Sequence, residues 1–161
     1  MPTSTELTFV QVTTHEEIEQ ARSLFEEYAA ALGISLCFQN FEHELATLPG
    51  KYSPPRGRLF LVLTGEDLVG CVALREIDEN VCEMKRLFLR PAFRGKGFGR
   101  VMVDAIVNAG REIGYKKMRL DTMTGKMDAA INLYLQAGFK EIPPYYDTPI
   151  VETSFLELVL A

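Results

Sequence analysis

Seven segments of the chain carry the hydrophobic pattern of β-strands. In each, apolar residues either occupy every second position or fill a short run between turn residues. ELTFVQV at 6–12 shows the alternation, and RLFLVLT at 58–64 shows the run. The predicted strands are residues 6–12, 58–64, 68–77, 81–89, 116–122, 139–142 and 153–160.

Four other segments have apolar residues three or four positions apart, which is the spacing of one helix face. These predicted helices are residues 18–32, 41–48, 98–113 and 127–137. Gly33, Gly114 and Gly138 follow three of them, where a left-handed cap is expected. The predicted order is strand, two helices, three strands, helix, strand, helix and two strands.

Length and composition fit a single domain covering residues 1–161. The chain has 161 residues, 47% of them hydrophobic, with no repeat and no linker segment. Cys37, Cys71 and Cys82 are far apart, so neither disulfides nor a metal site are expected. No basic segment followed by an apolar run opens the chain, and no stretch approaches about 20 apolar residues. We therefore expect a cytoplasmic protein.

Positive charge is concentrated in one window of an otherwise acidic chain. The net charge is −5, yet residues 85–100 contain six Lys and Arg residues and no acid, which leaves −11 for the remainder. A basic window of this kind is often just a solvated face. Here Gly95, Gly97 and Gly99 lie among the charges, which favours a discrete anion site over general nucleic-acid binding.

The stretch LRPAFRGKGFGR at 89–100 has the layout of a phosphate-binding turn. A strand that ends at Leu89 and a helix that begins near Gly97 direct unpaired backbone N–H groups at one point. Two common phosphate motifs do not fit. A P-loop needs Ser or Thr after its Gly-Lys pair, and the third glycine of G-x-G-x-x-G would come one residue later than Gly99.

An RNA-binding alternative comes from the same residues. KGFGRVMV at 96–103 overlaps the RNA-recognition pattern K-G-F-G-F-V-x-F, and LFLVL at 59–63 could be its partner strand. However, Arg100 and Val103 stand where two base-stacking aromatics are needed. The apolar residues from Phe98 onward also follow a helical period. Both observations count against the RNA reading.

The spacing Arg94-x-x-Gly97-x-Gly99 resembles the signature of the GNAT superfamily of acyl-CoA-dependent N-acyltransferases. MKRLFLRPAFRGKGFGRVMV at 84–103 is similar to the family's strand, turn, pyrophosphate loop and helix, and LYLQAGFKEI at 133–142 to its downstream segment. The resemblance implies an α/β (mixed α+β) GNAT-type fold. Its central sheet would be mixed but mostly antiparallel, with about seven strands, four flanking helices, and strands four and five splayed apart.

The resemblance also implies the cofactor site. Acetyl-CoA would be the acyl donor, with backbone N–H groups of residues 95–100 on its pyrophosphate and the fourth strand pairing with its pantetheine arm. The N–H of Leu87 would also stabilise an oxyanion at the thioester carbonyl. The residues implied in cofactor binding are Leu87, Phe88, Leu89, Arg94, Gly95, Lys96, Gly97, Phe98, Gly99, Arg100, Asn132 and Tyr134. Many members carry an asparagine where this chain has Met127, with Asn132 nearby.

Three residues are the catalytic candidates. Tyr134 in the LY...GF segment would protonate or hydrogen-bond the leaving thiolate, unless it is simply a core tyrosine. Leu87 would contribute its N–H. Strand alternation places Glu83 on the same face as Leu87, so Glu83 is the candidate base and Asp121 the second candidate. His15 and His43 are expected on the surface.

The sequence thus predicts an N-acetyltransferase that moves an acetyl group from acetyl-CoA to a primary amine by direct attack in a ternary complex. The alternative is a non-catalytic acyl-CoA-binding or sensing module. A small-molecule amine is the expected acceptor and a peptide amine the alternative; no nucleic acid, membrane or metal is expected, and the resemblance allows a homodimer. The acidic remainder of the chain suits a cationic amine. Aromatic residues would line its site, namely Tyr28, Phe38, Phe41, Tyr52, Tyr145 and Tyr146.

Overall fold

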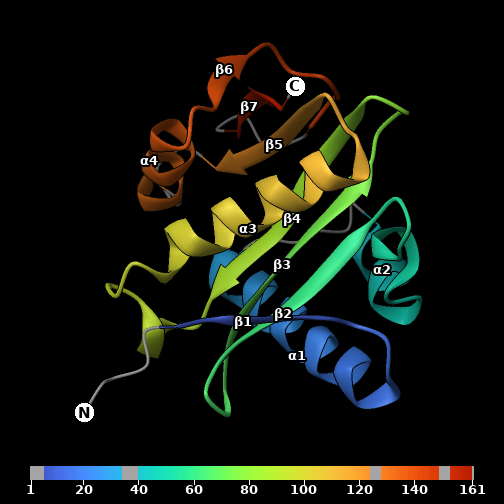
Figure 1. Ribbon diagram of the computed structural model, residues 1–161, viewed down its shortest axis with the longest axis vertical. Helices are drawn as coiled ribbons and strands as arrows, with labels where there is room; N and C mark the ends of the chain where they lie inside the picture. The colour runs from blue at the N-terminus through green and yellow to red at the C-terminus, as the bar shows by residue number, and fades with distance from the viewer. Residues whose placement is uncertain (1–5, 34–39, 124–127, 149–152, 161) are drawn as a thin grey trace.

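The order of helices and strands is the predicted one (Figure 1). The computed structural model describes residues 6–33, 40–123, 128–148 and 153–160. The strands are β1 (Thr8–Gln11), β2 (Arg58–Thr64), β3 (Asp67–Glu76), β4 (Val81–Leu89), β5 (Lys117–Met123), β6 (Lys140–Ile142) and β7 (Thr153–Val159). The helices are α1 (His15–Leu32), α2 (Phe41–Ala46), α3 (Phe98–Ile113) and α4 (Asp128–Gln136), with short 3-10 turns η2 (Gly50–Tyr52) and η3 (Pro91–Phe93).

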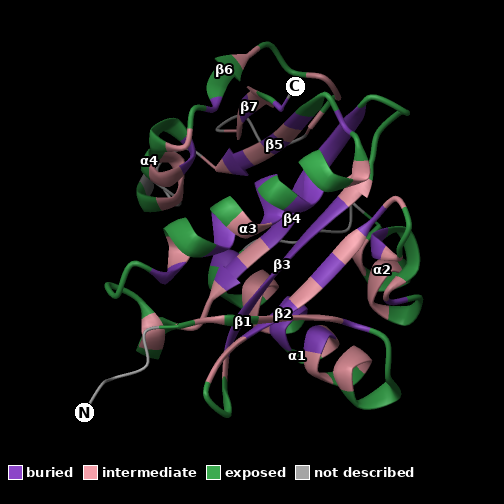
Figure 2. Cartoon of the chain, in the orientation of Figure 1, coloured by how far each residue is buried: buried purple, intermediate pink, exposed green. Residues whose placement is uncertain are grey.

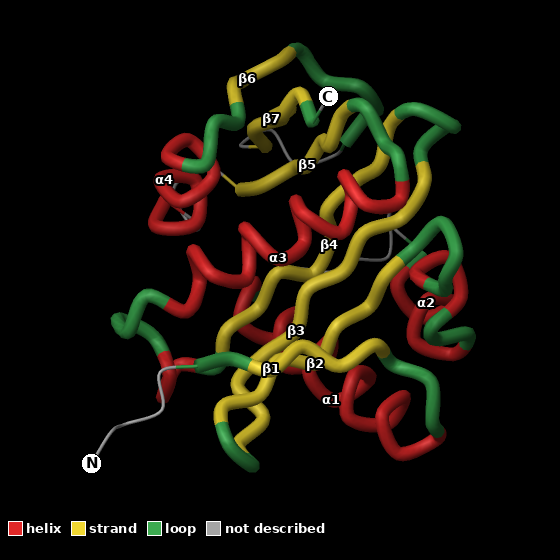
Figure 3. The backbone as a smooth tube through the Cα atoms, in the orientation of Figure 1, coloured by secondary structure: helices red, strands yellow, loops and turns green. Residues whose placement is uncertain are grey.

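The strands form one mixed sheet in the order β1-β2-β3-β4-β5-β7-β6. Only β4 and β5 pair in parallel, and their registered pairs run from Val81–Lys117 to Glu83–Arg119. Beyond that point the two strands diverge, as the backbone trace shows (Figure 3). The predicted fold, with a mostly antiparallel sheet split between its fourth and fifth strands, is therefore confirmed.

Helices cover both faces of the sheet, and β3 and β4 are buried along most of their length (Figure 2). On one face Cys71 and Ala73 of β3 pack with the buried side of α1 and with the partly buried apolar residues of α2. On the other, Val72 and Leu74 pack with α3 and α4. Continuous burial on both faces is typical of a central strand. The split between β4 and β5 therefore opens in the middle of the molecule.

The helix ends follow local sequence signals. At the start of α1, the Thr14 side chain accepts from the Glu17 N–H while the Glu17 carboxylate accepts from the Thr14 N–H, which is a capping box. Gly33 and Gly114 end α1 and α3 in the left-handed conformation, as predicted. Gly138 also has a positive φ, and Phe139 packs its buried ring on Tyr134. This contact fixes the end of α4 that carries Tyr134.

A β-bulge interrupts β4 at its centre. Cys71 pairs with Phe88 and Ala73 with Lys85, so Arg86 and Leu87 together lie opposite the single residue Val72. Arg86 has φ of 57°, a left-handed conformation that is uncommon for a residue with a side chain. An extra residue reverses the alternation of side chains beyond it. After the bulge, the side chains of the last three residues of β4 therefore face the sides opposite to those expected for an unbroken strand.

Candidate active site

The glycine-rich loop adopts the geometry predicted for an anion site. Gly95 and Gly97 have φ of 80° and 82°, and Gly97 is the N-cap residue of α3. The first N–H groups of a helix have no partner within the helix. No described group accepts from the N–H of Phe98, Gly99 or Arg100. These donors and the positive end of the helix dipole therefore point at the same region.

This loop ends a groove of about 490 Å³, here called the glycine-loop groove. Its residues come from the end of β4, the loop, the first turns of α3, and α1 and α4. They include Tyr28, Leu87, Phe88, Leu89, Arg94, Gly95, Gly97, Gly99, Arg100, Ala130 and Leu133. A Cβ added at Gly95 or Gly97 would meet nothing within 4 Å. The loop thus leaves open the space into which a phosphate would approach the backbone, so these residues fit a nucleotide diphosphate such as that of CoA.

Gly99, the third glycine of the loop, is explained by its contact with α4 and not by a positive φ. A Cβ at Gly99 would lie 2.8 Å from the Leu133 Cδ1 atom, so any larger residue there would displace the end of the Leu133 side chain on α4. Phe98 is buried, and only its amide can serve an anion.

A small gap of about 20 Å³ opens where β4 and β5 part, here called the strand gap. It shares Tyr28 and Leu87 with the glycine-loop groove. Tyr134 and Asp121 also line it. From Met84 to Leu89, β4 has no registered partner on its β5 side. Its outward-facing main-chain groups therefore have no partner strand there, and the Leu89 carbonyl accepts from the Arg94 side chain.

The structure corrects one prediction about β4. Leu87 packs with Met84 and Cys82 in the core on the α3 side, whereas Glu83 lines the cavity on the other face. Because the bulge at Arg86 reverses the alternation, Glu83 and Leu87 do not lie on the same face. The prediction assumes an unbroken strand, in which residues four positions apart share a face, and the bulge breaks that pattern.

Tyr134 is buried at the strand gap. Burial raises the pKa of its phenol, so it stays protonated and can act as a hydrogen-bond donor. Within the described residues, no protein group hydrogen-bonds its hydroxyl. Thr122 lies in the same gap, and its Oγ1 atom is buried with no partner. The gap thus holds two hydroxyls that the described protein groups leave unsatisfied.

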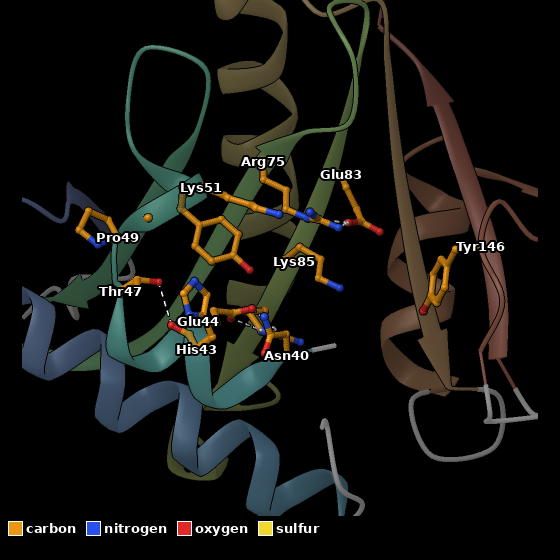
Figure 4. Close-up of a pocket in the computed structure, with 13 residues that line it drawn as sticks. Asn40, His43, Glu44, Thr47, Pro49, Lys51, Arg75, Glu83, Lys85 and Tyr146 are labelled. Atoms are coloured by element: carbon orange, nitrogen blue, oxygen red, sulfur yellow. Dashed lines mark hydrogen bonds and ion pairs between the residues drawn. The ribbon is translucent and has the colours of Figure 1, made fainter. Parts of the chain in front are cut away.

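A second cavity of about 620 Å³ lies on the α2 side of the sheet, here called the basic pocket (Figure 4). It shares Lys85 and Arg86 with the strand gap. Residues of α2, η2, β3, β4 and the segment before β7 line it, including His43, Glu44, Lys51, Arg75, Glu83, Lys85, Arg86 and Tyr146. The glycine-loop groove and the basic pocket are therefore joined through the gap.

Both candidate bases are held by other side chains. Oε1 of Glu83 accepts from Nε and Nη2 of Arg75, at 2.9 and 2.8 Å, and Oε2 accepts from the Tyr145 hydroxyl at 2.7 Å. Asp121 accepts from the Tyr146 hydroxyl and lies 4.0 Å from the Lys85 ammonium. Burial and the nearby carboxylates raise the pKa of both tyrosines. Each carboxylate thus lies beside one neutral phenol and one cation.

Other predicted residues lie farther from these cavities. Lys96 is an exposed loop residue, and Asn132 is exposed on α4 and does not line the groove. The guanidinium of Arg94 donates back to the Leu89 carbonyl, and that of Arg100 pairs with Asp104. Among the predicted aromatic residues, Tyr52 and Tyr146 line the basic pocket and Tyr28 the groove. Phe38, Met127 and Cys37 lie outside the described residues.

Glu44, Lys51, Arg75 and Arg86 line the basic pocket but were not identified as site residues from the sequence. Arg86 is buried and holds Glu44 through two hydrogen bonds of 2.9 Å, while its guanidinium lies over Phe41. Lys51 and Arg75 come from η2 and β3. Buried arginines need partners, and KR at 85–86 inside a strand was the one available signal. The partners are distant in sequence, so only the fold brings them together.

Comparisons with known proteins agree with this fold. Residues 17–139 match the model of the acetyltransferase (GNAT) family. An uncharacterized N-acetyltransferase of Schizosaccharomyces pombe is 36% identical over 91% of this chain and 90% of its own. A crystal structure of an acetyltransferase from Streptococcus agalactiae has a TM-score of 0.77 at 21% identity and covers 95% of this chain and 98% of that one. An N-acetyltransferase of Campylobacter jejuni, solved with acetyl coenzyme A, has a TM-score of 0.63 at 19% identity over 97% of this chain and 100% of that one.

The fold and the match to the family model together show that the protein is an acyltransferase. More narrowly, the chain belongs to the acetyltransferase (GNAT) family, because the family model covers most of its length. Among the described helices, none has the length and apolar character needed to cross a membrane. The described residues also contain no cluster of His, Cys, Asp and Glu side chains suited to a metal ion.

Proposed function

We propose that the protein transfers an acetyl group from acetyl-CoA to the primary amine of a small molecule, by direct attack in a ternary complex. The observation that carries this proposal is the meeting of two cavities at one gap. The glycine-loop groove would hold the donor and the basic pocket the acceptor, and both share lining residues with the strand gap. Two substrates can thus approach the gap from two different cavities.

Acetyl-CoA supplies an activated acyl group as a thioester. On the protein side, the amides of residues 95–100 would bind its diphosphate, and Arg94 and Lys96 would add positive potential. The open edge of β4 at Leu87 and Leu89 would pair with the pantetheine arm, over Phe88. The acetyl-CoA in the Campylobacter jejuni structure of similar fold supports this choice of donor.

Tyr134 and Leu87 act at the gap as hydrogen-bond donors. The N–H of Leu87 would stabilise negative charge on an oxygen placed there. The Tyr134 phenol, kept neutral by burial, would donate to a thiolate and lower the cost of its departure. Asn132 would take part in donor binding only if its exposed side chain turns toward the groove.

The acceptor amine must lose a proton, and we assign Glu83 as the acceptor of that proton. Glu83 lies four strand residues from Leu87, which is about 13 Å of extended chain. Transfer would therefore pass through water, for which Oε2 of Glu83 keeps a lone pair, since among the described residues it accepts only from Tyr145. Asp121 lines the gap itself and is the nearer carboxylate. The two assignments are separated by variants described in the Discussion.

Direct attack also agrees with the described cysteines. Cys71 and Cys82 are fully buried and line none of the three cavities. Burial raises the pKa of Cys71, and it raises that of Cys82 to about 12. Neither thiol is thus suited to carry an acyl group.

The experiment is a thiol-release assay with acetyl-CoA and a panel of amines, with CoA binding measured separately by calorimetry. Tyr134→Phe should lower kcat by about 10- to 100-fold, the value of one hydrogen bond to a charged group, while the Kd for CoA changes less than about twofold. Tyr115→Phe is the matched control, because its hydroxyl donates to the Arg56 carbonyl outside these cavities.

Three results would change the proposal. If the wild-type protein binds CoA but acetylates no amine, a sensing module becomes the better description. If Tyr134→Phe keeps full turnover, Tyr134 has no chemical role. If CoA does not bind, the groove is not a donor site.

A further inference from the structure

The basic pocket has the opposite charge to the chain as a whole. Four cationic side chains line it, those of Lys51, Arg75, Lys85 and Arg86, against the two carboxylates of Glu44 and Glu83. The net charge of the chain is −5. A cleft lined by one sign of charge concentrates ligands of the other sign. The expectation of a cationic acceptor, drawn from the overall charge, therefore does not fit this pocket.

Three of the four cations, Arg86, Lys85 and Arg75, already face carboxylates. Arg86 is buried and paired with Glu44 through both arms of its guanidinium. Lys85 lies at the entrance to the strand gap, 4.0 Å from Asp121. Arg86 and Lys85 mainly hold the protein's own carboxylates in place.

The other two cations have unused donors. Arg75 directs Nε and Nη2 at a single oxygen of Glu83, and within the described residues its Nη1 group has no acceptor. Lys51 is exposed on η2 and makes no ion pair with any described residue. Figure 4 shows the side chain of Lys51 running across the pocket toward that of Arg75. Two like charges that converge in this way are relieved by an anion between them.

Carboxylates lie next to these cations. Glu83 accepts from Arg75, and Tyr146, across the pocket from Glu83 (Figure 4), donates to Asp121, which lines the strand gap. A positively charged amine is favoured beside these carboxylates, next to the gap where transfer would occur. The pocket thus places the cations Lys51 and Arg75 next to the carboxylate of Glu83. Its volume of about 620 Å³ suits a small molecule.

We propose that the acceptor is a free amino acid, whose carboxylate binds Lys51 and Arg75 while its amine lies beside Glu83 and Asp121. This inference rests on the proposed function, since it names the acceptor class of the same site. A carboxylate accepts from the Arg75 Nη1 group and the Lys51 ammonium as charge-assisted hydrogen bonds.

The test compares amino acids with their own α-carboxamides as acceptors for acetyl-CoA. The two have the same amine and side chain and differ in the charge that Lys51 and Arg75 would bind. We expect wild-type protein to show a KM about tenfold lower for the best amino acid than for its carboxamide. Lys51→Met should raise the KM for the acid toward that for the carboxamide, and Lys51→Arg should restore most of the difference.

Lys116→Met is the matched control, because Lys116 is an exposed lysine outside the pocket, and it should keep the preference for the acid. The inference is overturned if carboxamides or spermidine are acetylated as well as the amino acids, or if Lys51→Met leaves the acid preference intact. In those cases acetyl transfer is still observed, so the proposed function stands. Failure of the proposed function would instead appear as no transfer to any amine.

Discussion

The Tyr145 hydroxyl donates a 2.7 Å hydrogen bond to Oε2 of Glu83, from the segment between β6 and β7 to β4. It bridges the two halves of the split sheet at the level of the last β4–β5 pair, Glu83–Arg119. Arg119 also lies against the Tyr145 ring, with its guanidinium carbon 5.3 Å from the ring centre. The Glu83 carboxylate is therefore fixed in the wall of the basic pocket, next to Arg75.

Glu83→Gln tests this carboxylate as the proton acceptor. The amide keeps the shape and can still accept from Tyr145, but it has little basicity, so kcat should fall by about 100-fold with an unchanged Kd for CoA. Glu76→Gln is the control, since Glu76 pairs with Arg56 on the surface of β3. If Asp121→Asn costs more turnover than Glu83→Gln, the nearer carboxylate is the base instead.

Gly97→Ala tests the loop as a phosphate cradle. Gly97 has φ of 82° and open space where a Cβ would stand, so alanine strains the backbone and fills the cradle. We expect a loss of about 1–2 kcal/mol in the free energy of unfolding and a Kd for CoA weakened by about tenfold. Gly65, in the β2–β3 turn, also has a positive φ, of 62°, and open space where a Cβ would stand, so Gly65→Ala is the control. This control should lose a similar amount of stability and keep its affinity for CoA. Equal CoA binding by both variants would contradict the proposal that the loop holds the phosphates.

The elements around the groove could be predicted from the sequence because their signals are local. Apolar spacing marked α3, Pro91 marked the end of β4, and the glycines of the loop have the backbone conformation that favours glycine. The part of the site proposed to bind the acyl donor could be predicted because most of it lies in one continuous stretch of sequence.

The basic pocket and the bulge depend on contacts between distant segments. The left-handed conformation of Arg86 is held by β3 and by Glu44 of α2, and nothing in the sequence around Arg86 indicates it. The face of every later β4 residue follows from that bulge. In the same way, Lys51 and Arg75 are brought together only by the fold, which is why the net charge of the chain misled about the pocket.

Glu44→Ala tests the buried pair of α2 and β4. Arg86 has a side chain only 2% exposed, and the substitution removes the carboxylate that pairs with this buried charge. The free energy of unfolding should fall by about 3 kcal/mol, measured by urea denaturation. Glu42→Ala, on the exposed side of the same helix, should change it by no more than about 0.5 kcal/mol. Similar losses in both variants would show that the pair contributes little.

Alkaline pH should destabilise the protein through its buried tyrosines. Burial raises the pKa of Tyr52 and Tyr134 in the folded state, whereas in the unfolded chain a tyrosine ionises near pH 10. The unfolded state therefore loses protons that the folded state keeps. The contribution of these tyrosines to the free energy of unfolding is fully present below about pH 10 and is lost as the pH rises above it. Each such tyrosine contributes a slope of about 1.4 kcal/mol per pH unit. Urea denaturation between about pH 9 and pH 11 measures this slope, and Tyr52→Phe or Tyr134→Phe should each reduce it, because phenylalanine cannot ionise. A slope unchanged in both variants would mean that other groups cause the alkaline transition.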